Sequence, residues 1–213
     1  MKMLQERRAI AAAIVASACF TNAPAQTVIE EWGSAKLPPP PALKAATLNP
    51  AETALLVMDF TRQTCSVERR PRCAASVAKV QKLVALARAK GALVIYSVAV
   101  PGSTAADILT DLAPAPGELV LPPLGPDKFV NSDLEKILKG KGIKTVVALG
   151  TQAQTSVLHT GAAAALRGFK VVVPVDGMSS EDTYFEQYTA FHLSRAPGVA
   201  QQTTLTKFDM IQF

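Results

Sequence analysis

Histidine is scarce in this chain of 213 residues, which contains only His159 and His192. The two histidines are well separated, and the sequence has no Cys-x-x-Cys pair. Zinc sites are usually built from closely spaced histidine and cysteine ligands. We therefore expect no zinc site of common type.

Aromatic and charged residues are also sparse, at 6% and 18%, whereas hydrophobic residues make up 49% of the chain. So apolar a composition excludes an intrinsically disordered protein. The net charge of +5 is spread along the chain, and with few aromatic residues it is a poor match to a nucleic-acid surface. We therefore expect no nucleic acid as a partner.

The N-terminal apolar run, residues 9–20, has about 12 residues, too few to cross a hydrocarbon core of roughly 30 Å. It follows the basic residues Lys2, Arg7 and Arg8 and precedes Ala23-Pro24-Ala25, which is the pattern of a cleaved leader. We predict that residues 1–25 are a signal peptide and that the protein is periplasmic or secreted, without a stable membrane span.

Two alternatives for export remain at this point. The segment Ala16-Ser17-Ala18-Cys19 imperfectly matches a lipoprotein site, which would anchor the protein through Cys19, and Arg7-Arg8 weakly matches a twin-arginine signal. Cleavage after residue 25 removes three positive charges and one negative charge, Glu6, and leaves a mature chain of about +3.

After export the remaining cysteines are Cys65 and Cys73, separated by seven residues. An oxidising compartment favours a disulfide between them, and the alternative is two unrelated thiols. In the chain-entropy model so short a bridge stabilises the fold by about 2–3 kcal/mol.

The mature chain divides into an arm and one domain. Residues 26–52 have little periodicity and contain Pro38-Pro39-Pro40-Pro41, which favours polyproline II. We interpret them as a Pro-rich N-terminal arm that lies on the surface or on a neighbouring subunit, and residues 53–213 as a single folded domain.

Strand and helix patterns alternate through the domain. Strands are expected at 53–58, 93–98, 145–149, 170–175 and 203–205, and helices at 77–87, 105–112, 133–139, 155–167 and 183–194. This order predicts an α/β fold with an open, mainly parallel sheet flanked by helices on both faces. The alanine-rich segment 162–165 indicates close packing against the sheet or a partner, and we expect a homo-oligomer.

Three polar residues fall where such a sheet binds ligands, beyond the carboxyl ends of its strands. Asp59 follows the first strand, Ser156 lies just beyond the third at a helix N-terminus, and Lys128 is in the loop before the connecting helix. A carboxylate, a hydroxyl and an ammonium group can serve as base, nucleophile and charge stabiliser. Their spacing does not show that they meet: Asp59 could form a structural ion pair, Lys128 could be solvated, and Ser156 could cap a helix.

Three segments carry a family resemblance: Leu55 to Phe60 (LLVMDF), Asp127 to Phe129 (DKF) and Gly150 to Thr160 (GTQAQTSVLHT). Together they resemble the isochorismatase-like hydrolases, also called cysteine hydrolases, over residues 53 to about 210. This superfamily includes nicotinamidases, carbamoylsarcosine amidases and isochorismatases. The resemblance implies a catalytic Asp at Asp59 and a catalytic Lys at Lys128, and it places Ser156 at the position of the nucleophilic Cys.

The serine is a departure from the cysteine-dependent members, because a carboxylate activates a hydroxyl poorly compared with a thiol. Isochorismatases proper also lack the cysteine and hydrolyse a vinyl ether, with the Asp handling the proton and water attacking. Ser156 is therefore a nucleophile, a polar group lining the pocket, or a purely structural residue.

The resemblance further implies an oxyanion hole built from backbone N–H groups at Thr151, Gln152 and Ala153, next to a cis peptide bond. Some members bind a metal through Asp-x-His near the second strand, whereas residues 96–100 here read YSVAV, so we expect no metal. The residues expected to bind substrate are Phe60, Gln63, Phe129, Gln152, Ala153 and Tyr184.

The other polar residues are expected to be structural. We place His159 in the core or an interface and His192 on a packed helix face. We interpret Arg69, Arg70 and Arg72 as a solvated loop, with recognition of a substrate carboxylate as the alternative.

The hypothesis from the sequence and its resemblance is an exported hydrolase, free of metal and of any other cofactor, whose partner is a small-molecule substrate: an amide, ester or enol ether. Its alternative is a catalytically silent periplasmic binding or scaffold protein on the same fold.

Overall fold

The computed structural model describes residues 27–34 and 36–213, so the predicted signal peptide lies outside the described residues. The chain divides into two units, residues 1–38 and 39–213. In the first unit a single helical turn, α1 (Val28–Glu31), is capped by the side chain of Thr27. Across the described ranges no helix is both long enough and apolar enough to cross a membrane.

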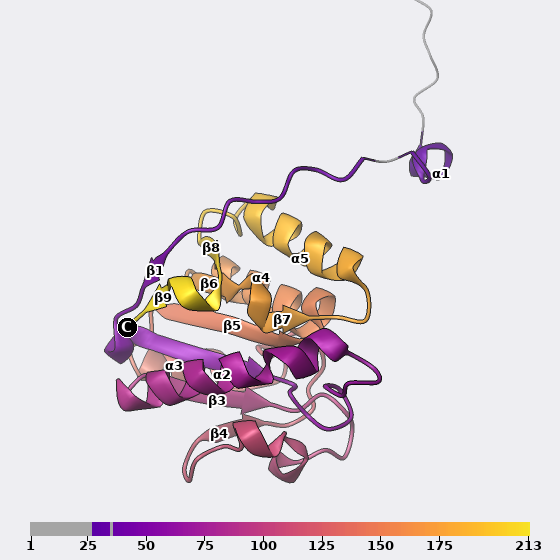
Figure 1. Cartoon of the computed structure of the whole chain (residues 1–213). Coiled ribbons are helices and arrows are strands. Elements are labelled where there is room, and N and C mark those ends of the chain that lie inside the picture. Colours follow the sequence, from indigo (N-terminus) through magenta and orange to yellow (C-terminus); the bar gives the residue numbers. More distant parts are fainter. Residues whose placement is uncertain (1–26, 35) are drawn as a thin grey trace, which may run out of the picture. The chain divides into compact units, whose positions relative to one another are not determined.

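The second unit is built on a parallel sheet (Figure 1). Its strands are β2 (Thr53–Met58), β3 (Leu93–Ser97), β4 (Leu119–Leu121), β5 (Thr145–Thr151), β6 (Lys170–Pro174), β7 (Met178–Ser179) and β8 (Thr203–Thr206). Their order is β4-β3-β2-β5-β6-β8, with β7 paired to the end of β5, and every pairing is parallel. The prediction of an open, mainly parallel sheet is confirmed.

Helices cover both faces of this sheet. The helices are α2 (Pro71–Ala89), α3 (Leu134–Gly140), α4 (Leu158–Leu166) and α5 (Thr183–Arg195). Buried residues of α2 pack with one core cluster, and those of α3, α4 and α5 pack with the other. The three-layer α/β architecture is therefore as predicted.

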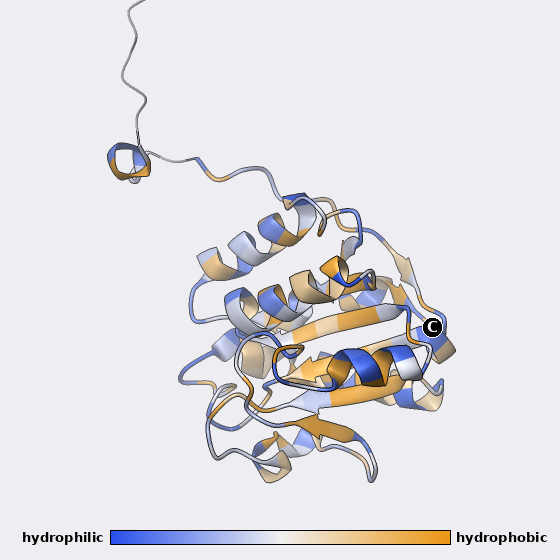
Figure 2. Cartoon of the chain, turned by 180° about the vertical axis from the view of Figure 1, so that it is seen from behind, coloured by the Kyte–Doolittle hydropathy of each residue, from blue (hydrophilic) through white to orange (hydrophobic). Residues whose placement is uncertain are grey.

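The central strand β2 contributes to both cores because its side chains alternate between the two faces. Leu55 and Val57 belong to the cluster on the α2 face, whereas Leu56 and Met58 belong to the cluster on the opposite face. Figure 2 shows the strands as the most continuously hydrophobic part of the chain. Burying one such side chain contributes about 1.5–3 kcal/mol, so the sheet is a rigid support for the residues at its ends.

Part of the predicted arm belongs to the second unit. Residues Ala46–Thr47 form β1, which pairs in parallel with β9 (Ile211–Gln212), and Leu48 donates its N–H to the Gln212 carbonyl at 2.8 Å. A short 3₁₀ turn, η1 (Pro50–Glu52), then leads into β2. A two-residue strand is too short to show periodicity, so the sequence did not indicate this pairing.

Several element bounds differ from the predicted ones. The expected helix at 105–112 consists of two 3₁₀ turns, η2 (Ala105–Asp107) and η3 (Thr110–Leu112), and the strand β4 was not predicted. Two further 3₁₀ turns are η5 (Val175–Gly177) and η6 (Phe208–Met210). The expected helix at 155–167 divides into a π-helical turn, η4 (Ala153–Val157), followed by α4. Segments of three to five residues are too short to show the apolar periodicity from which helices and strands are predicted.

The alanine-rich part of α4 packs within its own chain. Ala164 and Ala165 are buried in the same cluster as Leu193 of α5. A Cβ atom added at Gly161 would contact Leu193 and Val171 of β6 at 3.6 and 3.8 Å. Small residues on α4 therefore let it approach both β6 and α5, so the alanine run faces the sheet and α5.

Candidate active site

Asp59, Lys128 and Ser156 meet at the carboxyl ends of β2 and β5. The Nζ atom of Lys128 lies 2.9 Å from Oδ2 of Asp59. Ser156 donates its hydroxyl hydrogen bond to the same Oδ2 atom. All three side chains are buried. The three chemical groups singled out in the sequence thus converge on one carboxylate oxygen.

Asp59 is held in an unusual backbone conformation. Its φ is +63°, in the left-handed region that residues other than glycine adopt rarely. Its N–H donates to the Ser97 carbonyl at 3.1 Å, and its own carbonyl accepts the Thr61 N–H at 2.9 Å and the Thr64 hydroxyl. Such a conformation persists only where surrounding contacts over-determine it, as these three hydrogen bonds do at the end of β2.

Ser97, the last residue of β3, binds the other oxygen of Asp59. Its hydroxyl donates to Oδ1 at 2.6 Å in a fully buried contact. Oδ1 is therefore committed to Ser97, and Oδ2 is the oxygen shared by Lys128 and Ser156. The sequence analysis noted the segment around Ser97 only for its lack of metal ligands and missed this residue. The available signal was a polar residue that closes the apolar strand LVIYS, in register with Met58.

Lys128 is positioned by the loop before α3 and by α4. Its Nζ also donates to the Gly125 carbonyl at 3.0 Å, and its N–H donates to the Thr160 hydroxyl at 3.1 Å. A buried charge left without its partner is strongly destabilising, by about 3–5 kcal/mol, so Asp59 and Lys128 depend on each other.

Ser156 reaches Asp59 because β5 approaches β2 closely at Gly150. A Cβ atom at Gly150 would lie 2.3 Å from the Met58 carbonyl oxygen, and its φ is +151°, so this position requires glycine. Beyond it the Thr151–Gln152 peptide bond is cis, as the family resemblance implied. The η4 turn then carries Ser156 towards the carboxylate.

The N-terminal turn of η4 also suits an oxyanion. The first N–H groups of a helix have no partners within the helix and favour negative charge. Gln152 is half-buried and precedes η4, and Ala153 is its first residue and is buried. Both lie within four residues of Ser156, where the resemblance placed an oxyanion hole.

The remaining predicted substrate residues have different surroundings. Phe60 is buried in the core cluster on the α2 face, and Gln63 is exposed and donates to Asp107 Oδ1 at 3.2 Å. Phe129 is buried, with its ring stacked on Phe169 and covered by the guanidinium of Arg167. Tyr184 is 55% exposed on α5.

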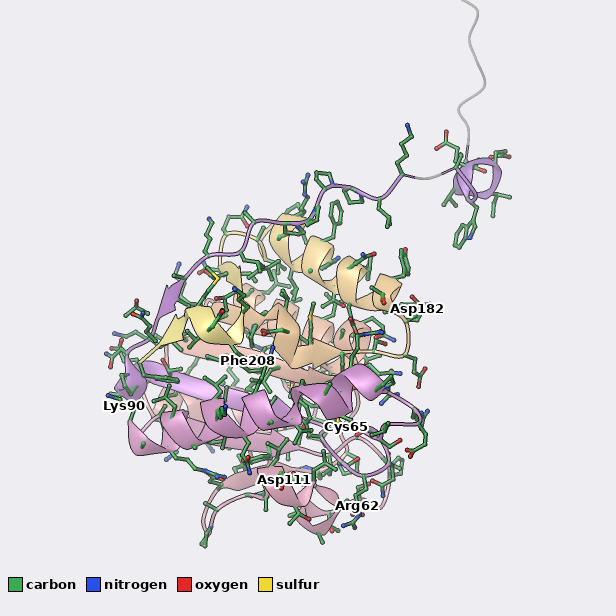
Figure 3. The ribbon with its side chains drawn as sticks, in the orientation of Figure 1. Arg62, Cys65, Lys90, Asp111, Asp182 and Phe208 are labelled. Carbon is green, nitrogen blue, oxygen red and sulfur yellow. A yellow bond between two sulfur atoms is a disulfide. The ribbon has the colours of Figure 1, made fainter. Side chains whose placement is uncertain are left out.

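Cys65 and Cys73 form the predicted disulfide, with their Cα atoms 5.3 Å apart. Figure 3 shows Cys65 beside α2, the helix that contains Cys73. The bridge closes a loop next to Thr64, whose hydroxyl contacts Asp59. The disulfide therefore anchors one wall of the site.

Arg70, inside this loop, is buried, so the expectation of a solvated loop is wrong for it. It donates to the Thr64 carbonyl at 2.6 Å and to Glu181 at 2.9 Å. Hydrogen bonds from Arg69 and then Arg70 lower the pKa of the Glu181 carboxyl. Arg72 binds Glu186 at 2.8 Å. All three arginines thus bind carboxylates of this chain, which join the disulfide loop to the start of α5.

The two histidines lie on α4 and α5. His159 is exposed on α4 and is therefore not in the core of this chain, which leaves an interface as the other expected surrounding. His192 is half-buried, with its ring 5.9 Å from that of Tyr188. Both line a groove of about 640 Å³ between α4 and α5, whose wall includes Asp127 and Gln154. Within the described ranges, no three His, Cys, Asp or Glu side chains are grouped as metal ligands would be.

A sequence comparison with known protein families matches residues 53–206 to the isochorismatase domain. These residues include the whole site. Two similar proteins are known by name. The secreted isochorismatase effector Isc1 of Verticillium dahliae is 33% identical over 81 residues, 38% of this chain and 43% of that protein. Streptothricin hydrolase of Streptomyces noursei is 28% identical over 153 residues, 65% of this chain and 58% of that protein. The match thus spans about half the length of these curated relatives.

The fold also matches a solved cysteine hydrolase from Pseudomonas syringae pv. phaseolicola. The TM-score is 0.68 at 19% identity, covering 79% of this chain and 94% of that one. At this identity the likeness concerns the fold alone, whereas the domain match extends over most of the sequence. The chain therefore belongs to the isochorismatase family of hydrolases.

Proposed function

We propose that this hydrolase cleaves a small-molecule amide, ester or enol ether, with Asp59 as its proton-transfer group. The observation that carries the proposal is the convergence of Lys128 and Ser156 on Oδ2 of Asp59. A buried charged pair adds little to stability, so its retention beside a polar hydroxyl is better explained by chemistry.

Each residue has a distinct role in this proposal. Asp59 accepts a proton from the attacking group or donates one to the leaving group. Lys128 keeps a positive charge against Oδ2 and offsets negative charge that develops on the substrate. The N–H groups at Gln152 and Ala153 provide hydrogen bonds to an oxyanion, and Tyr184, which is 55% exposed, contributes an apolar contact to the substrate.

We propose water as the attacking group, with Ser156 as a polar wall that orients it. A serine nucleophile normally needs a histidine base, and both histidines lie in the α4–α5 groove. The carboxylate of Asp59 can orient a water molecule and take its proton as the bond to the leaving group breaks. The reaction proposed here involves no metal and no cofactor.

The protein is further proposed to be exported and to work as a homo-oligomer. The Cys65–Cys73 disulfide supports an oxidising compartment, and one similar protein is described as secreted. Exposed aromatic residues on α5 support assembly.

The test is hydrolysis of a panel of small amides, esters and enol ethers by the wild-type protein, Asp59→Asn and a control, Asp111→Asn. Asp111 is exposed on η3, so Asp111→Asn makes the same change of charge at a distance from the site. Turnover that Asp111→Asn retains and Asp59→Asn loses supports the proposal. Binding of a panel compound without turnover by any variant would favour the silent binding protein instead.

A further inference from the structure

Thr160, on α4, binds the backbone of the loop that carries Lys128. Its hydroxyl accepts the Lys128 N–H at 3.1 Å and donates to the Pro126 carbonyl at 3.2 Å. The residue is fully buried. A hydroxyl has one hydrogen to donate and lone pairs with which to accept, so this single side chain satisfies two backbone groups of opposite kind. The function proposed above gives Thr160 no role.

Several other hydrogen bonds of this loop are local. The Lys128 carbonyl accepts the Ser132 hydroxyl at 2.6 Å, and the Asp127 carboxylate accepts the Phe129 N–H at 2.9 Å. The Lys128 ammonium itself reaches back to the Gly125 carbonyl at 3.0 Å. Bonds of this kind set the shape of the loop, but they do not set its place against the sheet. The contact from α4, 32 residues further along the chain, does fix that place.

The helical segment that contains Thr160 also carries Ser156. Thr160 lies about one turn beyond Ser156, past the end of η4 and the start of α4. Ser156 contacts Oδ2 of Asp59, and the Lys128 ammonium lies 2.9 Å from the same oxygen. One helical segment therefore holds one partner of Oδ2 directly and holds the other through the loop that Thr160 binds.

We propose that Thr160 is a positioning residue, which holds the Lys128 ammonium against Oδ2 of Asp59 during the reaction. The proposal rests on the function proposed above, in which Lys128 offsets negative charge that develops on the substrate. Such stabilisation requires a group that is already in place, and a displacement of about 1 Å can cost about a hundredfold in rate. Without the hydroxyl, the Lys128 N–H and the Pro126 carbonyl lose their shared partner, so the loop has to move to find others.

Three variants separate positioning from packing. Thr160→Val keeps nearly the same shape and removes the hydroxyl, whereas Thr160→Ser keeps the hydroxyl. The matched control is Thr189→Val, because Thr189 is also fully buried on a helix and its hydroxyl donates to the Phe185 carbonyl at 2.8 Å within α5. It measures the loss of a buried threonine hydroxyl whose hydrogen bond stays within its own helix. If Thr160→Val does not fold, Thr160→Ala takes its place and is interpreted in the same way.

The first measurement is steady-state kinetics on the best substrate of the panel. Thr160→Val is expected to lower kcat by about tenfold or more and to leave KM within about threefold of the wild type, because the substrate still binds while the ammonium is misplaced. Thr160→Ser should recover most of kcat, and Thr189→Val should retain it. Wild-type kcat in Thr160→Val, an equal fall in Thr189→Val, or a Thr160→Ser variant as slow as Thr160→Val would overturn the proposal.

The second measurement needs no substrate, so it distinguishes failure of this proposal from failure of the proposed function. The proton–nitrogen NMR signal of the Lys128 ammonium, identified by its loss in Lys128→Arg, reports how fast its hydrogens exchange with water. Thr160→Val should raise this exchange rate at least about tenfold, because the loop then opens more often, whereas Thr160→Ser and Thr189→Val should leave it near the wild-type rate. Equal rates in the wild type and Thr160→Val would overturn the proposal, as would a wild-type rate as fast as that of the exposed lysines.

Discussion

Ser97 holds Asp59 at two points, through a hydroxyl that donates to Oδ1 at 2.6 Å and a carbonyl that accepts the Asp59 N–H at 3.1 Å. One residue of β3 thereby fixes both the backbone and the carboxylate of the residue that follows β2. With Oδ1 bound to Ser97, Oδ2 is the oxygen that contacts Lys128 and Ser156.

Replacing Asp59 by asparagine should abolish proton transfer while keeping the shape of the side chain. Loss of a general acid or base typically lowers the rate by about 10²–10⁴-fold, and we expect a fall in kcat of that size. Steady-state kinetics on the best substrate of the panel would measure it, with Asp111→Asn as the control. Full activity of Asp59→Asn would remove the assignment of the site.

Replacing Ser97 by alanine should lower kcat by about tenfold or more, because a misplaced group in a site costs rate even where it does not react. KM should change little, since Ser97 contacts the carboxylate and is buried behind it. The variant Ser97→Thr retains the hydroxyl and should recover most of the activity. If Ser97→Thr is as slow as Ser97→Ala, the serine acts only through packing.

The variant Ser156→Ala distinguishes the two modes of attack. If water attacks, as we propose, kcat should stay within about tenfold of the wild type, a difference of roughly 1.4 kcal/mol in the barrier. If Ser156 is a covalent nucleophile, Ser156→Ala should lose as much activity as Asp59→Asn, because members of one catalytic unit fail together. Mass spectrometry of protein quenched during turnover provides the second measurement, and an acyl group on Ser156 would contradict attack by water.

Removal of the disulfide in the double variant Cys65→Ala, Cys73→Ala should lower the free energy of unfolding by about 2–3 kcal/mol. Urea denaturation with and without reductant would show this. The wild type should lose stability on reduction, whereas the double variant should not respond. Activity should fall with the disulfide, because its loop holds Arg70 against Thr64 and Thr64 against Asp59.

Tyr96 makes the free energy of unfolding depend on pH in the alkaline range. Burial raises the pKa of its hydroxyl from 10.0 to about 12. Between these values the unfolded chain loses the proton while the folded chain keeps it, so the free energy of unfolding should fall as pH rises from 10 to 12. The slope from this group is at most about 1.4 kcal/mol per pH unit. Urea denaturation of Tyr96→Phe should show a shallower decline, and the control Tyr188→Phe, on an exposed ring, should follow the wild type.

The parts of the fold that follow from local patterns could be predicted from the sequence. The strand 53–58 is buried at every position and could be recognised by its apolar run, and this placed Asp59 at a strand end. The meeting of Asp59 with Lys128 could not be derived from spacing, because 68 intervening residues can fold in many ways, and only the resemblance suggested it.

Contacts that depend on tertiary structure could not be predicted from the sequence. Ser97 reaches Asp59 because β3 pairs with β2 in a register that aligns Met58 with Ser97. The burial of Arg70 depends on Glu181, more than a hundred residues away, which supplies a partner for its charge. Neither the contact of Ser97 with Asp59 nor the burial of Arg70 can be inferred from the residues that surround them in the sequence.

The close approach of β5 to β2 at Gly150 places the fixed part of the site in the interior of the sheet. The spacing between Asp59 and Ser156 is set by strands packed inside the protein, whereas residues 99–118 and 181–188 lie largely at its surface. Glu181 and Glu186, in the second of these segments, nevertheless bind the arginines of the disulfide loop. The interior of the sheet therefore sets the spacing of the polar groups, and the start of α5 supports only the loop beside them.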